Sequence, residues 1–427
     1  MSIDFYKEEG PLGYLANYSN HGFIVENTYY KTAEHFYQAN KFDDPKIREK
    51  VINADTPKEA SNIGRDRNNI RRKDFKDIKL DVMQEGLYQK FKQNKDIRSK
   101  LIETRNEPIR EMTTKESYWG IGPNLDGENH IGNILMNVRN RVKCELLGEL
   151  LNKCKNKKVY VIGHHKPDVD SVFSSLLLTK ILKELGFDAT FAVRDENFVD
   201  KEFIKDYLKE DYEVVDDYSN KNFILVDHNN LDQIPKENVL GSIDHHRITN
   251  EVEDLIEIEY ASTGLLIYDL FKDLYQFTEE DKKLIALTVL SDTEFLTSSR
   301  FSEEDQKLYK ELDVKLDSKE LKKKYLKTTP FNLEISDNFL RDYKEYNYNG
   351  FHINRSLIKS YEDDRKKHFQ EYQDHMKKNS INLMIWCDYE TLETYICYND
   401  LNLKFPYFTT STYLVLDYLK EKEYLKK

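Results

Sequence analysis

The sequence predicts three consecutive domains: a mainly α N-terminal domain, an α/β domain with a parallel sheet, and a smaller α+β C-terminal domain. Three observations predict this order along the 427 residues. Apolar residues first recur at helical spacing, short β-branched runs then alternate with helical segments, and strand-like runs resume after a charged connector. We expect the domains to span residues 1–148, 157–310 and 325–427.

The first domain is predicted to be mainly helical because its apolar residues follow the helical repeat. Leu80, Met83, Leu87 and Phe91 recur at intervals of three and four residues. The segments IRSKLIETRN and IGNILMNVRNRVKCELLGELL continue the same pattern. We therefore expect several amphipathic helices before residue 148.

The middle domain is predicted to contain a parallel sheet. The short runs VYVIG, ATFAV, NFILVD and LGSID are separated by helical segments such as VFSSLLLTKILKELG. Strands that alternate with helices form parallel sheets with crossover helices. Beyond a charged helical connector that starts near residue 305, the runs GFHINRSLIKSY, NLMIWCDY and ETYICYND predict the third, α+β domain.

Composition limits the class of protein. Sixty-five Lys and Arg residues stand against 77 Asp and Glu residues, and the net charge of −12 argues against a general nucleic-acid-coating protein. The four cysteines have no metal-ligand spacing and predict free thiols. No apolar run approaches the roughly 20 residues of a membrane span, and the first residues show no apolar signal segment. We expect a cytoplasmic protein with no membrane partner.

Acidic and imidazole side chains follow several of the strand-like runs. They are His164, Asp168, Asp170, Asp227, His228, Asp244, His245 and His246, and Asp292 follows in the segment LSDT. Each alone would most often be a surface or capping residue. Open α/β sheets gather the carboxyl ends of their strands at one edge, so these groups would be buried together, and several buried carboxylates need a cation. Mixed imidazole and carboxylate ligands favour Mn, Co or Zn, and a metal pair about 3.5 to 4 Å apart supports phosphoester hydrolysis.

The segments GHHKPDVDS, LVDHN, SIDHH and LSDT resemble the four signature motifs of the DHH phosphoesterases, above all the family II inorganic pyrophosphatases and exopolyphosphatases. The resemblance covers about residues 157–310. It implies two divalent metal ions, with Mn expected first and Mg or Co as alternatives. It implies that one metal is held by His164, Asp168 and Asp227, and the other by Asp170, Asp227, His245 and Asp292. It further implies that His246 donates a proton to the substrate, with Asp244 and His228 orienting the ligands.

One feature of those pyrophosphatases is missing. They carry a Ser-Arg-Lys motif near the C-terminus that grips phosphate, whereas the corresponding segment FPYFTTSTYLVLDYL has no Arg or Lys. Pyrophosphate is therefore left open as the substrate. Arg355, Lys359 and Arg247 are alternative phosphate contacts, although each is more often simply an exposed cation.

The N-terminal domain offers a second candidate site. The segment GYLANYSNHGFIVENTYYKTAEHFYQANKF places Glu34 on a predicted helix among aromatic and amide side chains. Most of these aromatic residues, such as Tyr30 and Phe36, are expected in the core. Asn17, Glu34, Arg65 and Trp119 are the stronger candidates for a ligand site. A carboxyl group in an aromatic pocket can have its charge state tuned for proton transfer or for stabilising an oxocarbenium-like sugar.

The segments TAEHFYQANKF, IGRDR and SYWGIGPNLDGENHIGNILMNVR resemble the NADAR (YbiA-like) family over about residues 3–146. The resemblance implies N-glycosidase activity on ribosyl or ADP-ribosyl linkages, with Glu34 as the catalytic carboxylate. It also implies that Asn17, Arg65, Trp119, Gly120 and Asn129 shape the ligand pocket. Some relatives have a lysine soon after the GRDR loop, and here the first lysine is Lys73.

Together these features predict a bifunctional hydrolase that combines an N-glycosidase with a two-metal phosphoesterase. Its expected partners are small nucleotide, ADP-ribose-like or phosphorylated substrates, while ADP-ribosylated nucleic acid and a homodimer remain open. One alternative is a metal-dependent nucleotide or pyrophosphate phosphohydrolase whose first domain only senses ADP-ribose. A non-enzymatic regulator with a structural metal is less favoured, because structural sites usually saturate their metal with protein ligands.

Overall fold

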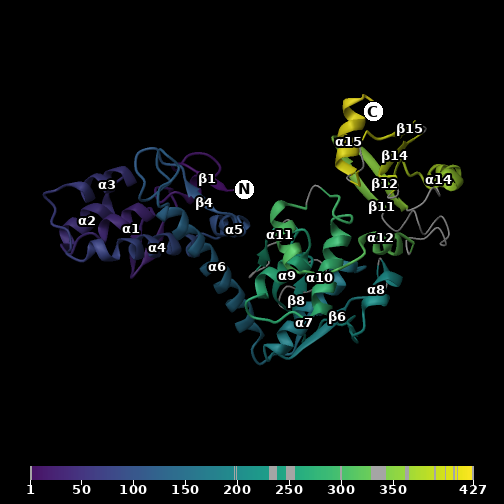
Figure 1. Cartoon of the computed structure of the whole chain (residues 1–427), viewed down its shortest axis with the longest axis horizontal. Helices are drawn as coiled ribbons and strands as arrows, with labels where there is room; N and C mark the ends of the chain where they lie inside the picture. The colour runs from purple at the N-terminus through teal and green to yellow at the C-terminus, as the bar shows by residue number, and fades with distance from the viewer. Residues whose placement is uncertain are drawn as a thin grey trace. The chain divides into compact units, whose positions relative to one another are not determined.

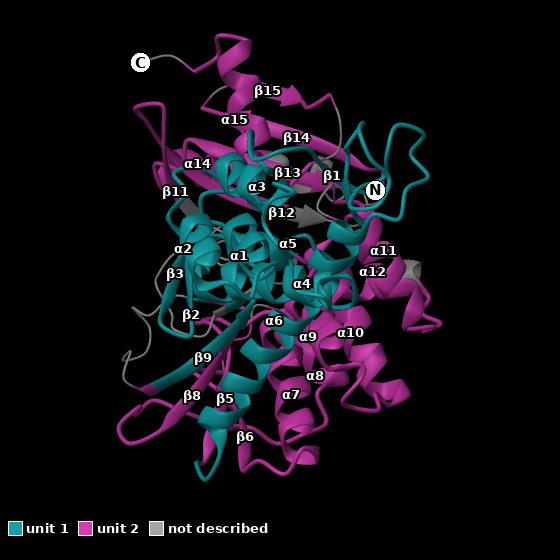
Figure 2. Ribbon diagram, turned by 90° about the vertical axis from the view of Figure 1, so that its left-hand side faces the viewer, with its two compact units in different colours: residues 1–157, 229–231, 239–259 teal, residues 158–228, 232–238, 260–427 magenta. Residues whose placement is uncertain are grey.

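The computed structural model describes residues 2–196, 198, 200–229, 238–246, 255–298, 301–327, 343–360, 365–388, 391–399, 401–406, 409–410 and 412–425. The chain divides into two compact units, residues 1–157, 229–231 and 239–259 and residues 158–228, 232–238 and 260–427 (Figure 2). Within the described part of the chain, we find no helix with the length and apolarity that a membrane crossing requires.

The N-terminal region combines helices with two small sheets (Figure 1). Strands β1 (Ile3–Phe5) and β4 (Ile109–Glu111) pair in parallel, and β2 (Phe23–Val25) and β3 (Thr28–Tyr30) form an antiparallel hairpin. The helices are α1 (Ala33–Ala39), α2 (Pro45–Asn53), α3 (Pro57–Arg65), α4 (Phe75–Gln93), α5 (Lys95–Glu103) and α6 (His130–Cys154), with a 3-10 turn at Gly13–Leu15. The small sheets were not predicted, because strands of three residues are too short to show alternation.

Helix α1 owes its position to a cap at one end and to aromatic packing on its sides. The Thr32 hydroxyl accepts a hydrogen bond from the His35 amide and so satisfies one of the free N–H groups of the first turn. The Phe36 ring packs edge-on against Tyr30, with 5.0 Å between ring centroids, and also contacts Phe23. All seven residues of α1 are buried, including Glu34.

The middle region contains a six-stranded sheet in the order β10-β9-β8-β5-β6-β7. The strands are β5 (Val159–Ile162), β6 (Ala189–Val193), β7 (Glu213–Val214), β8 (Asn222–Val226), β9 (Val239–Asp244) and β10 (Leu255–Glu257). The strand pairs β5–β6, β5–β8, β6–β7 and β9–β10 are parallel, which confirms the predicted parallel sheet. Every residue of β5 is buried, as expected for a strand covered on both faces.

Helices connect these strands and follow them. They are α7 (Val169–Glu184), α8 (Lys201–Tyr207), α9 (Thr263–Phe271) and α10 (Glu279–Asp292). Helix α10 begins with a capping box, in which Thr278 and Asp281 each accept a hydrogen bond from the other's backbone amide. The charged connector folds as α11 (Glu303–Glu311) and α12 (Ser318–Lys327).

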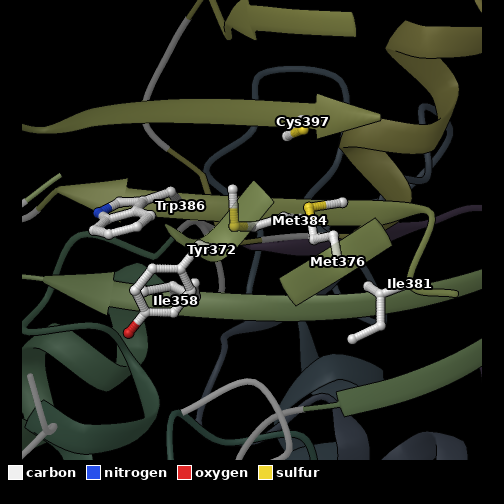
Figure 3. Packing of buried hydrophobic residues seen from close by; sticks show 7 residues of the cluster. All are labelled: Ile358, Tyr372, Met376, Ile381, Met384, Trp386 and Cys397. Carbon is white, nitrogen blue, oxygen red and sulfur yellow. The ribbon is translucent and has the colours of Figure 1, made fainter. Parts of the chain in front are cut away.

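The C-terminal region is a mixed sheet with helices, which confirms the predicted α+β class. Its strand order is β11-β12-β13-β14-β15, with β11 (Tyr343–Tyr348), β12 (Phe351–Ser360), β13 (Leu383–Asp388), β14 (Glu393–Tyr398) and β15 (Leu401–Lys404). Among the described strands of this C-terminal sheet, only β12 and β13 pair in parallel, and the other neighbouring strands pair antiparallel. Helices α14 (Arg365–Lys378) and α15 (Thr412–Glu421) complete it. Figure 3 shows its buried cluster, which consists of Ile358, Tyr372, Met376, Ile381, Met384, Trp386 and Cys397.

Candidate functional site

Glu34 lies at the centre of a polar cluster in the N-terminal region. Its side chain is on the first turn of α1, and the residue is only 4% exposed. Asn17 Nδ2 donates to Glu34 Oε2 at 2.7 Å, and Gln38 Nε2 donates to Oε1 at 2.6 Å. The Tyr18 hydroxyl lies 3.5 Å from Oε1. The Glu34 amide also donates to the Asn17 carbonyl at 3.0 Å, so backbone and side chain are fixed together.

Burial governs the charge of this cluster. It raises the pKa of Glu34, while the hydrogen bond from Gln38 and the positive charge of Lys41 oppose that rise. Lys41 is itself buried, and burial lowers its pKa to about 8 against the opposing pull of Glu34. Its ammonium lies 5.0 Å from the centre of the Tyr37 ring. A buried carboxyl group with a raised pKa and a buried amine with a lowered pKa therefore share one apolar environment, where burial disfavours the charged form of each group.

A second carboxyl group belongs to the same electrostatic environment. Burial raises the pKa of Glu111 to about 7, and the charges of Glu116 and Glu34 add to the rise. Glu116 accepts hydrogen bonds from the backbone amides of Tyr118 and Trp119, each at 3.0 Å. The Trp119 ring packs edge-on against Tyr37 of α1 at 5.6 Å. This loop thus carries an aromatic face to the helix that holds Glu34.

Gly120 and Asn129 hold the loop that carries Trp119 against β4. A Cβ atom on Gly120 would lie 2.5 Å from the Glu111 carbonyl oxygen, so only glycine allows this close approach. Asn129 has left-handed backbone geometry, with φ of 50°. Its side-chain oxygen accepts from the Glu111 amide at 3.0 Å, and its Nδ2 donates to the Ile109 carbonyl at 2.8 Å. The amide of Asn129 therefore holds β4.

The carboxyl end of β5 begins the second cluster. His164 Nε2 lies 3.4 Å from Asp227 Oδ2 and 3.7 Å from Asp168 Oδ2. These three residues offer ligand atoms within 4.8 Å of one another. Asp168 also caps α7, because its Oδ1 accepts from the Ser171 amide at 3.1 Å. Burial alone would lower the pKa of His164, but the two carboxylates raise it to about 12. Two carboxylates and one imidazole thus lie together at this strand end, and a divalent cation that binds them takes the place of the imidazole proton.

Asp227 and Asp170 are both anchored to the start of α9. Asp227 follows β8 with a left-handed φ of 61°, which is uncommon for a residue with a side chain. Asp170 is fully buried, and its two oxygens accept from the Thr263 amide at 2.7 Å and the Gly264 amide at 3.0 Å. The Thr263 hydroxyl donates to Asp227 Oδ1 at 3.1 Å. Asp292 is the last residue of α10 and lies partly buried.

The end of β9 carries the remaining predicted residues. Asp244 Oδ1 accepts from the His246 amide at 3.0 Å and lies 2.8 Å from His246 Nδ1. Its Oδ2 accepts from Asn229 at 2.8 Å. His245 is buried beside the His246 ring. His245 also belongs to two further groups with ligand atoms within 4.8 Å, one with Asp227 and His246 and one with Asp170 and Asp292.

Comparison with known proteins assigns both clusters to families. The NADAR domain model matches residues 4–143, and the model of the DHH family N-terminal domain matches residues 158–291. An N-glycosidase of Nostoc punctiforme is 39% identical over 146 residues, which cover 34% of this chain and 94% of that protein. The chain belongs to the NADAR family and carries a DHH domain. The N-glycosidase YbiA of Escherichia coli K12 is 34% identical over 143 residues, with 34% of this chain and 89% of that protein covered.

Among solved structures, a candidate family II inorganic pyrophosphatase of Methanococcus jannaschii is similar to this chain. It is 20% identical, with 59% of this chain and 95% of that chain covered and a TM-score of 0.45.

The donor set of the DHH domain fits divalent metal ions. Imidazole nitrogen and carboxylate oxygen together suit Mn, Co, Fe or Zn better than Ca. The carboxylates come from separate strand and helix ends, and Asp170 and Asp227 are almost completely buried. Buried carboxylates of this kind are stable as anions only when hydrogen bonds and a cation compensate their charge.

Sequence reasoning missed Arg194 of the DHH domain, which follows β6. Its Nε donates to the Gly163 carbonyl at 2.8 Å, and its Nη2 lies 3.0 Å from His228 Nε2. Because a guanidinium only donates, His228 Nε2 must accept, which places the ring proton on Nδ1. Arg194 thus connects the backbone beside His164 with the residue that follows Asp227. Because Arg194 follows the second strand-like run, ATFAV, it could have been found by applying the strand-end rule to residues other than acidic and imidazole ones.

In the NADAR domain the missed residues are Gln38, Lys41 and Glu111. Gln38 is four residues after Glu34 on α1, so helical spacing places the two side chains on one face of the helix, whereas Lys41 follows just beyond the end of α1. Lys73, by contrast, is exposed. Arg65 is the last residue of α3 and is exposed. Its positive charge opposes the rise that burial causes in the pKa of Glu34.

The alternative phosphate contacts remain untested. Arg355 is buried within the C-terminal sheet, where Nη2 donates to the Tyr346 hydroxyl at 3.1 Å. Arg247 and the side chain of Lys359 lie outside the described residues.

Proposed function

We propose that the chain is a bifunctional hydrolase. Its NADAR domain would cleave a ribosyl or ADP-ribosyl N-glycosidic bond, and its DHH domain would hydrolyse a phosphoester or pyrophosphate with two divalent metal ions. The observation that supports the first activity is the buried Glu34 carboxyl held by three side chains. The observation that supports the second is the His164, Asp168 and Asp227 cluster at the sheet edge.

The N-glycosidase activity follows from the surroundings of Glu34. Cleavage of a bond between ribose and a base develops positive charge on the sugar, and a fixed carboxylate stabilises that charge. Asn17 and Gln38 hold both oxygens of Glu34 in place, so the carboxylate need not reorganise during the reaction. Lys41 supplies a nearby amine that changes protonation near pH 8. The matching relatives of Nostoc punctiforme and Escherichia coli are described as N-glycosidases.

The leaving base needs a surface and a proton. Trp119 offers an aromatic face on which a base can stack, and Arg65 offers a positive charge for a phosphate of the substrate. Glu111 has a pKa raised to about 7 by burial, so it can still carry a proton at neutral pH. A pair of carboxyl groups is the arrangement that glycoside hydrolysis commonly uses. The substrate class is therefore a ribosylated or ADP-ribosylated base.

In the DHH domain, His164, Asp168 and Asp227 would hold one metal ion. Asp170, Asp227, His245 and Asp292 would hold the other, with Asp227 shared. Mn is the first expectation, with Mg and Co as alternatives. A bound pair would supply Lewis-acid polarisation of the phosphoryl oxygen and a more acidic water. His246, oriented by Asp244 at 2.8 Å, would donate a proton to the leaving oxygen.

Glu34→Gln tests the glycosidase. The amide keeps the shape of the side chain and removes its charge, so release of free base from ribosylated and ADP-ribosylated substrates should fall about 100- to 10,000-fold. Glu49→Gln, on an exposed residue of α2, should leave the rate unchanged. If wild type and Glu34→Gln release base at the same rate, the proposal is wrong. If wild type binds ADP-ribose without releasing base, the sensor alternative replaces it.

Phosphate release in the presence of Mn²⁺ tests the DHH domain. The substrates are pyrophosphate, NAD, ADP-ribose and cyclic nucleotides, each with and without a chelator. Asp227→Asn removes the shared ligand, and losing several kcal/mol of metal-dependent stabilisation lowers the rate by about 100-fold or more. Asp211→Asn, on an exposed residue, is the matched control. Release that survives both chelation and Asp227→Asn would contradict a metal-dependent phosphoesterase.

A further inference from the structure

One threonine contacts both of the buried carboxylates that would hold the second metal ion. Thr263 is the first residue of α9 and is fully buried. Its backbone amide donates to Asp170 Oδ2 at 2.7 Å, and its hydroxyl donates to Asp227 Oδ1 at 3.1 Å. Asp170 and Asp227 come from different parts of the chain, and Thr263 is 93 and 36 positions away from them.

The position of Thr263 is itself tightly fixed. Ser262 caps α9, since its hydroxyl accepts from the Leu265 amide at 3.1 Å and also contacts the Thr288 hydroxyl at 2.9 Å. A Cβ atom on Gly264 would lie 2.3 Å from Thr288 Oγ1, so glycine is needed for this approach of α9 to α10. The Gly264 amide adds a second backbone donor to Asp170, at 3.0 Å. The start of α9 is therefore a rigid support for Thr263.

The two side-chain oxygens of Asp227 have different partners, and the hydroxyl of Thr263 is the partner of one of them. Oδ1 accepts the hydroxyl proton, while Oδ2 faces His164 Nε2 at 3.4 Å. Asp227 has a left-handed φ of 61°, a backbone conformation that persists only where surrounding contacts hold the residue in place. Partners that orient metal ligands in this way commonly contribute 10- to 100-fold, roughly, to metal affinity.

We propose that Thr263 is a positioning residue that couples the two metal positions, because its amide fixes Asp170 and its hydroxyl fixes Asp227. This inference rests on the proposed metal-dependent function of the DHH domain. Loss of the hydroxyl removes one support of the shared ligand Asp227, while the backbone contacts of Asp170 remain. The binding of Mn²⁺ should therefore weaken in both steps, and the two steps should become less cooperative.

Calorimetric titration of the full chain with Mn²⁺ tests this proposal. Thr263→Val keeps the shape and removes the hydroxyl, and it should weaken Mn²⁺ binding about 10- to 100-fold. Thr263→Ser restores the hydroxyl and should bind within a few-fold of wild type. Thr179→Val is the matched control, because Thr179 is equally buried and its hydroxyl donates only to the Ser175 carbonyl within α7 among the contacts described.

Each outcome decides the proposal. If Thr263→Val binds Mn²⁺ as tightly as wild type does, the proposal is overturned. It is also overturned if Thr263→Ser binds Mn²⁺ as weakly as Thr263→Val does. Thr263→Ala, which removes the hydroxyl without adding a second methyl group, replaces the valine variant if that variant does not fold. If the wild-type chain binds no divalent metal ion, the proposed function of the DHH domain fails, and that result is distinct from any difference among the Thr263 variants.

Discussion

The NADAR and DHH domains bury carboxylates in opposite ways. Around Glu34 the chain supplies the compensation itself, with side-chain donors from Asn17 and Gln38 and a buried amine at Lys41. At the edge of the DHH sheet, Asp168 and Asp227 face the imidazole of His164, whose pKa they raise to about 12, and Asp227 also lies near His245 and His246. The first arrangement is complete without an added ion, whereas the second has the composition of a site that exchanges a proton for a metal ion.

This difference in charge compensation favours proton transfer at Glu34 and metal binding at the edge of the DHH sheet. A carboxyl group whose charge is balanced by the protein can be held near its ionisation point and can transfer protons. A cluster of carboxylates with fixed directions instead concentrates negative charge where a divalent ion can lie. Variants that remove charge should therefore have opposite consequences in the two domains. Three experiments use this contrast.

The largest effect is expected from Asp168→Asn. Mn²⁺ at 1,000 times its Kd should stabilise the folded chain by about 4 kcal/mol, because it binds the folded state alone. Asparagine can still cap α7 but removes one anionic ligand, so most of this stabilisation should disappear. Thermal unfolding of the full chain with and without Mn²⁺ measures it. Glu34→Gln should respond to Mn²⁺ as wild type does, and an equal loss of response in both variants would remove the contrast between the domains.

The next effect is a pH dependence at Glu111. Burial, together with Glu116 and Glu34, raises the pKa of Glu111 from 4.5 to about 7. A raised pKa means that the folded chain holds a proton that the unfolded chain releases between these values. The contribution of Glu111 to stability is therefore fully present below pH 4.5 and is lost as the pH rises through about 7.

Glu111→Gln removes this pH dependence. Above pH 7 the variant should be more stable than wild type by up to about 3 kcal/mol, and below pH 4.5 the two should be equal. Unfolding in denaturant across this pH range measures the difference. Glu49→Gln, at an exposed position, should show no such crossover. A constant difference between wild type and Glu111→Gln at every pH would mean that burial does not perturb Glu111.

The sequence predicted the DHH site better than the NADAR site, and the reason is geometric. Parallel strands end at one edge of a sheet, so the residues after each strand can be assigned to one place without knowing the tertiary structure. The strand-end rule placed His164, Asp168 and Asp227 in one larger group of acidic and imidazole residues, and the resemblance to DHH phosphoesterases assigned these three to one metal ion. The structure brings their ligand atoms within 4.8 Å of one another. Thr263 could not be found in this way, because its contact with Asp170 spans 93 positions of sequence and starts from a helix.

Around Glu34 the local spacing was available but was not used. Gln38 lies one helical turn after Glu34, and Lys41 follows just beyond the end of α1, whereas the lysine named from the sequence was Lys73, the first one after the GRDR loop. Asn129 is a residue for which the sequence predicted a ligand contact and the structure shows a structural role. Its residue type suits ligand binding, but the structure uses both ends of its amide for the backbone of β4. Only the fold could reveal which amides face a pocket and which hold a strand.

The smallest effect, and the finest test of the contrast, is expected from Asn17→Ala. Asn17 donates to Glu34 Oε2 at 2.7 Å, and a hydrogen bond to a charged group stabilises that group by about 1.5–3 kcal/mol. Its loss should raise the pKa of Glu34 further, because the burial that raises this pKa is then less opposed. The acidic limb of the pH–rate profile of the NADAR domain should therefore move to higher pH, while its alkaline limb should stay unchanged. The rate at neutral pH should fall about tenfold. Asn40→Ala, whose side chain donates to the Phe36 carbonyl at 2.9 Å on the same helix, controls for the loss of an amide. A lower rate with an unmoved acidic limb would mean that Asn17 places the substrate and does not set the charge of Glu34.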